Sequence, residues 1–143
     1  MSGANSTLIS GDFLGMRVSL WRAAGEQAPW VGYRSFWTPD RDHVNLYRTM
    51  PGFGGPAVYG IEVELGDSDL LDLRHSPWDA LGELFHLERE DYGAGEPDYE
   101  IFQALASMFK ASGYRWIAFY DGGHREAEHW MCLGDAELPV FRV

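Results

Sequence analysis

Apolar and polar residues alternate with a period of two in several short segments of the chain, which is the pattern of a β-strand with one buried face. The clearest example covers residues 57–65, where large apolar side chains alternate with glycine and glutamate from residue 59 onward. We expect strands over residues 17–22, 33–37, 57–65, 70–73, 116–120, 128–133 and 138–143. Helical segments are interspersed with these strands, so the expected fold class is α+β.

The first helix is expected directly after the second strand. Thr38 can cap this helix, Pro39 suits its first position, and Asp40 suits the positive end of its dipole. We expect the helix to continue to about residue 50. Val44 and Tyr47 then lie three residues apart on one helix face, where both can point at the end of the preceding strand.

Two further helices carry start signals of the same kind. Ser76 and Pro77 form a cap and first-position pair for a helix through about residue 87. Pro97 is expected to begin the longest helix, which Gly113 ends. Its apolar positions form one stripe that we expect to be core, made of Ile101, Leu105, Met108 and Phe109. Residues 88–96, between the two helices, are expected to form a surface loop.

The chain divides into a short polar start and one long folded region. Residues 1–14 are rich in Ser, Gly and Asn and are expected to be flexible, while residues 15–143 contain no linker and are expected to form a single domain. No apolar run approaches the roughly 20 residues that span a bilayer, and residues 1–12 lack the basic and apolar regions of a signal peptide. We therefore expect a soluble protein in the cytoplasm of the producing or target cell, without membrane contact.

The charge of the chain restricts its partners. Lys and Arg number 11 against 22 Asp and Glu, which gives a formal net charge of −11 at pH 7. A surface that binds nucleic acid needs a clustered excess of Lys and Arg, so direct nucleic-acid binding is not expected. A basic protein, or one that itself binds nucleic acid, is a compatible partner, although solubility alone also explains the charge. The one cysteine, Cys132, is expected to be a small buried strand residue.

Glu126 and Glu128 stand between a glycine-containing stretch, residues 121–125, and the apolar run of residues 130–133. Two carboxylates at the start of a strand can stabilise a positively charged sugar centre and accept a proton from a nucleophile. If the segment is extended, two residues at this spacing lie on the same side. The alternative interpretation is a solvated acidic edge of a sheet.

Three separated motifs resemble those of the ADP-ribosyltransferase superfamily, the diphtheria-toxin-like and poly-ADP-ribose-polymerase-like enzymes that transfer ADP-ribose from NAD. The motifs are Leu20-Trp21-Arg22-Ala23, the segment 36–40 followed by Tyr47, and Glu126-Ala127-Glu128. Segments 58–63 and 113–117 are similar to small phage and bacterial effector members, among them an anti-CRISPR transferase. The resemblance runs from about residue 17 to the C-terminus. It implies a split β-sandwich with surrounding helices, NAD as substrate, and mono-ADP-ribosylation of a protein target.

The resemblance also implies roles for the residues that bind NAD. Arg22 would hold a phosphate or ribose oxygen, and backbone groups of Ala23 would hold the nicotinamide amide. Tyr47 would stack on the nicotinamide ring, and Trp37 would form a wall of the pocket. The superfamily more often has glycine at the position of Ala23. The ordinary alternatives are a surface arginine at a strand end and two core aromatics.

For the reaction itself, the resemblance implies that Glu128 binds a ribose hydroxyl and stabilises the developing positive charge. Glu126 would take a proton from the attacking side chain, which is often arginine in family members with this pair. Thr38 or Ser35 would orient the catalytic carboxylate, and both stay candidates because the Ser-Thr-Ser triplet of the superfamily is not preserved here. For Thr38 the alternative role is the helix cap.

Two other functions remain open at this point. Water in place of the acceptor would make the protein an NAD glycohydrolase, and a chain that kept the fold without catalysis would be an acidic inhibitor or binding protein. A metal site is not expected, because His124 and His129 lack a standard ligand spacing and a third neutral ligand.

Overall fold

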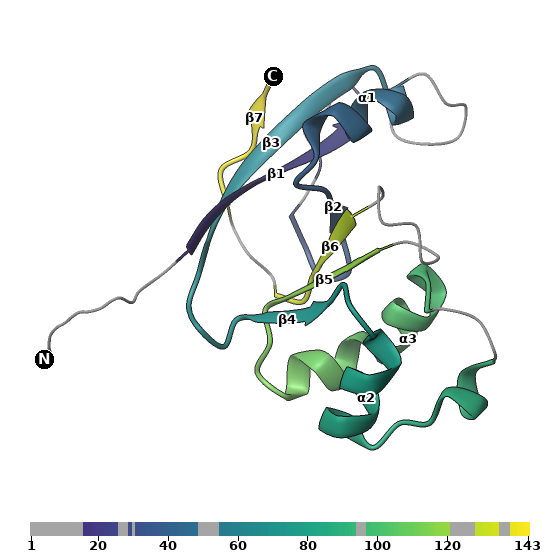
Figure 1. Ribbon diagram of the computed structural model, residues 1–143. Helices are drawn as coiled ribbons and strands as arrows, with labels where there is room; N and C mark the ends of the chain where they lie inside the picture. The colour runs from purple at the N-terminus through teal and green to yellow at the C-terminus, as the bar shows by residue number, and fades with distance from the viewer. Residues whose placement is uncertain are drawn as a thin grey trace, which may run out of the picture.

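The computed structural model describes residues 16–25, 29, 31–48, 55–93, 97–120, 128–134 and 138–143. In these ranges the chain is a mixed α and β structure with two sheets, one of order β1-β3-β7 and one of order β2-β6-β5-β4 (Figure 1). The strands are β1 (Met16–Ala24), β2 (Phe36–Trp37), β3 (Ala57–Leu65), β4 (Leu70–Leu73), β5 (Trp116–Tyr120), β6 (Glu128–Cys132) and β7 (Phe141–Arg142). The helical elements are α1 (Arg41–Arg48), α2 (Pro77–Phe85), the 3₁₀ turn η1 (Arg89–Tyr92) and α3 (Tyr99–Ala111).

The three-stranded sheet is antiparallel. Strand β1 pairs with β3 over its whole length, and β7 pairs with the other edge of β3. Gly60 on β3 faces Trp21 on β1, and a Cβ at this position would come within 2.5 Å of the indole of Trp21 and 2.7 Å of the ring of Phe141. A residue without a side chain therefore allows these two aromatics to meet edge to face over the sheet.

The four-stranded sheet contains one parallel pair. Strands β4 and β5 run parallel, and α2 and α3 lie between them in the sequence, as a parallel connection requires. Both helices cover the face of this sheet that points away from β1 and β3 (Figure 1). The core there is rich in aromatics, with Phe102, Phe109 and Phe119 buried together. Phe102 lies outside the expected apolar stripe of α3, of which Leu105 and Phe109 are buried and Ile101 and Met108 are partly buried.

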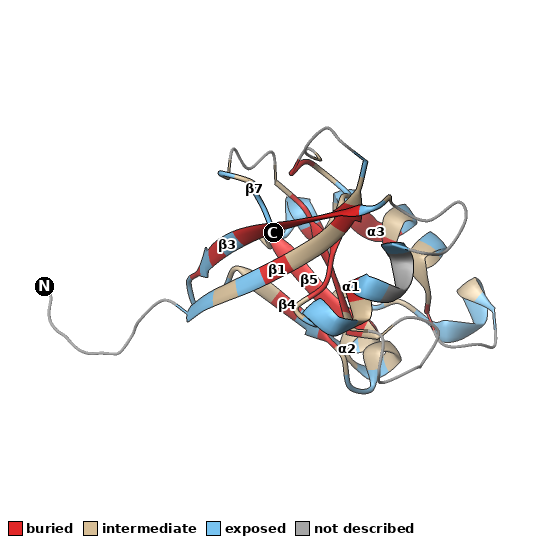
Figure 2. Cartoon of the chain, turned by 90° about the horizontal axis from the view of Figure 1, so that it is seen from above, coloured by how far each residue is buried: buried red, intermediate tan, exposed pale blue. Residues whose placement is uncertain are grey.

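A second core lies between the two sheets. Leu20, Ile61 and Val63 from the three-stranded sheet meet a group of tryptophans from the four-stranded sheet, Trp37, Trp116 and Trp130. Buried residues accordingly follow β3 and β5 in Figure 2. The sheets are joined where Trp21 of β1 bridges Thr38 through two backbone hydrogen bonds of 2.8 and 3.0 Å. We call the face of the four-stranded sheet that carries Trp37 and Trp130 its inner face.

The first helix starts later than the sequence predicts. It begins at Arg41, and the residue before it is the cap, because Asp40 Oδ1 accepts hydrogen bonds from the N–H groups of Asp42 and His43 at 3.0 and 3.2 Å. The expectation that Thr38 caps this helix, with Pro39 at its first position, is wrong. The bridge to Trp21 keeps Thr38 in an extended strand, and its Oγ1 accepts from the N–H of Asp40 at 3.1 Å instead.

The other helix starts also differ in detail. Pro77 does stand at the first position of α2, but Ser76 has a left-handed backbone with φ of 46° and makes no capping bond with its side chain. For α3 the cap is Asp98, whose carboxylate accepts from the N–H groups of Glu100 and Ile101, so the helix starts after Pro97 and not at it. The expected surface loop at 88–96 contains the 3₁₀ turn η1.

Two expected strands are shorter than predicted. Only Phe36 and Trp37 of the segment 33–37 are a strand, since Tyr33 and Arg34 form a turn in which Arg34 has φ of 70°. Only residues 141–142 of the segment 138–143 pair with β3.

Cys132 is buried on β6 as expected. The expectation of a flexible start falls on residues outside the described part of the chain, and none of the helices in the described part is long and apolar enough to span a membrane.

Candidate functional site

The carboxylate of Glu128 lies on the inner face of the four-stranded sheet. Glu128 is the first residue of β6, and alternation along the strand puts it on the same side as Trp130. Glu128 Oε2 accepts a hydrogen bond of 2.8 Å from the indole Nε1 of Trp130. The side chain keeps 20% exposure, so it is held in place but still reaches solvent.

Arg22 approaches the same face from β1. It follows Leu20 at an interval of two, so it points toward the four-stranded sheet, and its guanidinium carbon lies 5.9 Å from the ring centroid of Trp37. Burial lowers the pKa of the Arg22 guanidinium below its usual range, although arginine still keeps its proton at physiological pH. No carboxylate in the described ranges lies within 4 Å of it. The result is a partly buried cation that an anionic ligand would stabilise.

One pair of tryptophans carries both charged groups. Trp37 of β2 and Trp130 of β6 are register partners, Arg22 lies over the first, and Glu128 is bonded to the second. Arg22 and Glu128 are not an ion pair with each other. Glu128 stands two residues, roughly 7 Å, along β6 from Trp130. The cation and the anion therefore contact two paired tryptophans on one face without forming an ion pair with each other.

The backbone of Ala23 lies beside Arg22. Because the N–H and C=O of Trp21 bond to Thr38 on the β2 side, the same groups of Ala23, two residues on, also point to that side and away from β3. Outside the strand ladders, no backbone hydrogen bond within the described ranges uses them. The Ala23 side chain packs on the opposite face of the sheet, against Val44 and Val58. Only backbone groups of Ala23 thus face the β2 side.

Arg74, which follows β4, is a partner of Glu128 that the sequence analysis did not single out. Its Nη1 lies 3.5 Å from Glu128 Oε2, and its Nε and Nη2 both bond the Asp72 carboxylate at 2.8 Å. The hydrogen bond from Arg74 lowers the pKa of Asp72, and the hydrogen bond to Asp72 in turn raises the pKa of Arg74. The sequence did contain a signal for this pair: Asp72 and Arg74 are an acid and a base two residues apart at a strand end, and such residues share one face.

Ser35 and Trp37 form a unit at the other end of β6. Ser35 Oγ accepts from Trp37 Nε1 at 3.1 Å and donates to the Gly32 carbonyl at 2.7 Å. The Ser35 carbonyl accepts from the N–H of Cys132, which is four residues from Glu128, or roughly 13 Å along an extended strand. Ser35 therefore fixes the indole under Arg22 and does not contact Glu128. Trp37 is 1% exposed and supports this face from below.

Thr38 is not brought to the Glu128 carboxylate either. It is buried, and alternation turns its side chain to the side opposite Trp37, while Glu128 lies on the side of Trp37. Among the described residues, the groups in contact with the carboxylate of Glu128 are the indole of Trp130 and the guanidinium of Arg74. The side chain of Tyr47 and all of Glu126 lie outside the described residues, so their expected roles stay predictions.

A histidine on β6 lies behind this face. His129 points to the α3 side, is 4% exposed, and has its Nε2 2.8 Å from the hydroxyl of Tyr99. Burial, with a smaller contribution from the charge of nearby His43, lowers the pKa of His129 to about 4, so the imidazole is neutral at pH 7. In the described part of the chain no three His, Cys, Asp or Glu side chains are grouped to hold a metal ion. His124 lies outside that part.

The chemistry of the inner face follows from its two charged groups. Arg22 offers a fork of donors to an anion, and Glu128 offers negative charge to a centre that becomes positive. Both groups contact aromatic neighbours, Arg22 with Trp37 and Glu128 with Trp130. Comparison of the chain with protein-family models, with curated proteins and with solved structures finds no match.

Proposed function

We propose that this protein is an NAD-dependent mono-ADP-ribosyltransferase that modifies a protein. One observation carries the proposal: Arg22 lies over Trp37 and Glu128 bonds Trp130, and these two tryptophans are paired neighbours. Arg22 belongs to the first motif of the resemblance and Glu128 to the third, more than 100 residues later in the sequence. Their location on one face, over two paired tryptophans, supports a shared task.

The reaction matches the charges of the face. NAD carries negative charge on its pyrophosphate, which Arg22 would hold through paired hydrogen bonds. The bond between nicotinamide and ribose breaks as the ribose develops oxocarbenium character, and nicotinamide leaves with the bonding electrons. The Glu128 carboxylate stabilises that positive charge and accepts a hydrogen bond from a ribose hydroxyl. A nucleophilic side chain of the target then bonds to the ribose carbon and loses its proton to a base, the role proposed for Glu126.

Arg74 has a supporting part in this proposal. Its guanidinium lies beside the Glu128 carboxylate, and the bidentate bond to Asp72 keeps that guanidinium in position. Ala23 contributes the backbone groups next to Arg22, which suit the amide of nicotinamide. Split β-sandwich architecture of the transferase type belongs to the same proposal, and the two sheets joined at β1 and β2 support it.

A second candidate is a non-catalytic acidic binding protein on the same fold. The observation that favours it is that the Glu128 carboxylate already has partners within the protein: it accepts a hydrogen bond from Trp130 and pairs with Arg74. Such a group can be purely structural. Simple NAD hydrolysis is the third outcome, in which water takes the place of the target side chain.

A thermal-shift titration with NAD separates the first candidate from the second. A ligand that binds only the native state raises the melting temperature. At a ligand concentration 100-fold above Kd, the free energy of unfolding increases by about 2.7 kcal/mol. We expect wild-type protein to respond and Arg22→Gln to bind NAD roughly ten- to 100-fold more weakly, since a hydrogen bond to a charged group contributes about 1.5–3 kcal/mol.

Arg17→Gln is the matched control for that titration. Arg17 lies on the same strand and loses the same charge, but its side chain is 66% exposed and pairs with Glu62 and Glu64. We expect this variant to respond to NAD like the wild type. A wild-type protein whose melting temperature stays constant up to millimolar NAD would favour the binding protein over the enzyme.

A further inference from the structure

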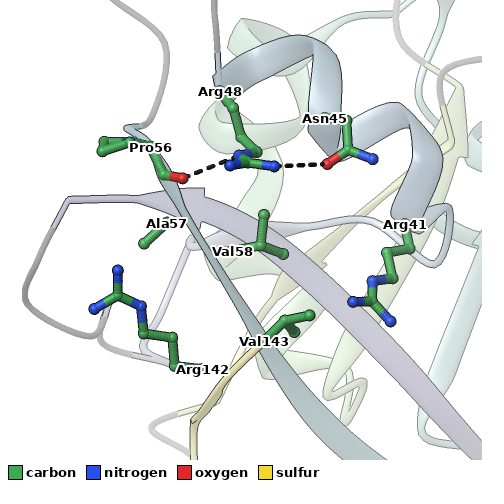
Figure 3. A pocket seen from close by; sticks show the side chains of 8 residues that line it. All are labelled: Arg41, Asn45, Arg48, Pro56, Ala57, Val58, Arg142 and Val143. Atoms are coloured by element: carbon green, nitrogen blue, oxygen red, sulfur yellow. Dashed lines mark hydrogen bonds between the residues drawn. The ribbon is translucent and has the colours of Figure 1, made fainter.

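A pocket of about 220 Å³ lies on the side of the three-stranded sheet that faces away from the four-stranded sheet (Figure 3). Helix α1 forms one wall with Arg41, Asn45 and Arg48, and the β3–β7 pair contributes Val58, Arg142 and Val143. Val58 packs with Ala23 and Val44, which identifies the side of the sheet. Arg22 points to the opposite side of β1, so this pocket is separate from the face that carries Glu128.

The helix presents its polar groups to the pocket as a row. Arg41, Asn45 and Arg48 are spaced by four and three residues, which puts them on one face of α1. The guanidinium groups of both arginines contact neutral groups. Arg48 Nε donates to the Pro56 carbonyl at 2.9 Å, and Arg48 Nη1 donates to Asn45 Oδ1 at 3.4 Å. The guanidinium of Arg41 lies 5.0 Å from the ring centroid of Trp21. Both heads are thus positioned before any ligand arrives.

The described residues that line this pocket include arginines and no acidic side chain, although the net charge of the chain is negative. The sequence has 22 acids and 11 bases, and Arg17, Arg74 and Arg115 each pair with a carboxylate. By contrast, no carboxylate of the described ranges lies within 4 Å of Arg41 or Arg48. The guanidinium groups of Arg41 and Arg48 lie along one small space, and a bound oxyanion would be attracted to both of them.

We propose that this pocket is a binding site for a phosphate-bearing ligand, in which Arg41 and Arg48 hold the phosphoryl oxygens. Arginine matches phosphate because its planar fork donates two parallel hydrogen bonds. The size fits a phosphate or pyrophosphate group, since sites for whole drug-sized ligands start at about 300 Å³. Asn45 adds an amide that can donate to the same ligand. The proposal stands on these residues alone and does not depend on the function proposed for Glu128.

Pyrophosphate is the probe for this site. Isothermal titration calorimetry measures its affinity and a thermal-shift assay measures the change in melting temperature, both at constant ionic strength. We expect saturable binding to wild type and at least tenfold weaker binding to the double variant R41Q/R48Q. The single variant Arg48→Gln, which leaves the Arg41–Trp21 contact intact, is expected to show the same direction of change if the double variant folds poorly. Arg115→Gln, whose charge lies elsewhere and pairs with Asp69, should bind like wild type.

Three results would overturn the proposal. The first is equal binding of pyrophosphate by wild type and Arg48→Gln, and the second is an equal thermal shift from sodium chloride at matched ionic strength. The third is loss of pyrophosphate binding in Arg22→Gln, which would move the anion to the other face of β1. Citrate separates the sources of negative charge: the proposal expects it to bind at least tenfold more weakly than pyrophosphate, and equal binding would contradict a phosphate site.

Discussion

Glu128→Gln is expected to lower the rate of ADP-ribose transfer by about 10²–10³-fold while changing NAD affinity only a few-fold. The amide keeps the shape of the side chain and can still accept the hydrogen bond from Trp130 Nε1, but it loses the negative charge. That charge acts on a centre that becomes positive only in the transition state, so its loss lowers kcat far more than it raises KM. Nicotinamide release and transfer of label from the adenylate part of NAD to protein in a cell lysate measure the rate.

Glu64→Gln is the matched control for this substitution. The substitution removes the same charge from β3, but the Glu64 side chain is 77% exposed and pairs with Arg17 on the outer surface of the sheet. We expect it to label at the wild-type rate. Equal labelling by wild type and Glu128→Gln would remove Glu128 from the catalytic role, whatever NAD affinity the two proteins have.

Acidification from pH 7.5 to 4 is expected to remove about 3 kcal/mol of the free energy of unfolding through His129 alone. In the folded protein burial lowers the pKa of His129 to about 4, against 6.5 for an ordinary histidine. Between these two values the unfolded chain binds a proton and the folded chain does not, so stability falls as the pH drops below about 6.5 and levels off below about 4. Each pKa unit corresponds to about 1.4 kcal/mol.

Urea unfolding at a series of pH values measures this loss. His129→Gln still offers an acceptor to the Tyr99 hydroxyl but does not titrate, so we expect its stability to change much less between pH 6.5 and 4. His75→Gln, at an exposed position, is the matched control for the loss of an imidazole. The lowered pKa of Asp72 affects stability only below about pH 4, which keeps the two effects apart. The same pH slope in wild type and His129→Gln would contradict the burial argument.

Local sequence patterns predicted correctly those strands and helices whose formation depends mainly on residues close to one another in the sequence. The alternation in residues 57–65 gave β3 with its correct bounds, because one face of that strand is buried against the other sheet. The start of α1 failed for a non-local reason. Thr38 and Asp40 are both good caps in isolation, and the choice between them is made by the bridge from Thr38 to Trp21, seventeen residues away.

The candidate site shows the same division. The motifs identified Arg22 and Glu128, and the strand period explains why each points between the sheets. The partners of Glu128 could not be predicted, since Arg74 is 54 residues away and reaches it only because β4 and β6 flank β5. Burial of Trp37 depends on the packing of one sheet against the other, which no local pattern specifies.

The most direct test of the proposed site follows the indole N–H signals of ¹⁵N-tryptophan-labelled protein during NAD titration. The chain has six tryptophans, and Trp→Phe variants assign their signals. When a ribose hydroxyl approaches Glu128, the bond from Trp130 Nε1 must change, while Trp78 beside Tyr92 serves as an internal reference. We predict that the Trp130 signal moves most and the Trp78 signal stays in place. A Trp130 signal that is unchanged at saturating NAD would contradict the claim that NAD binds on this face.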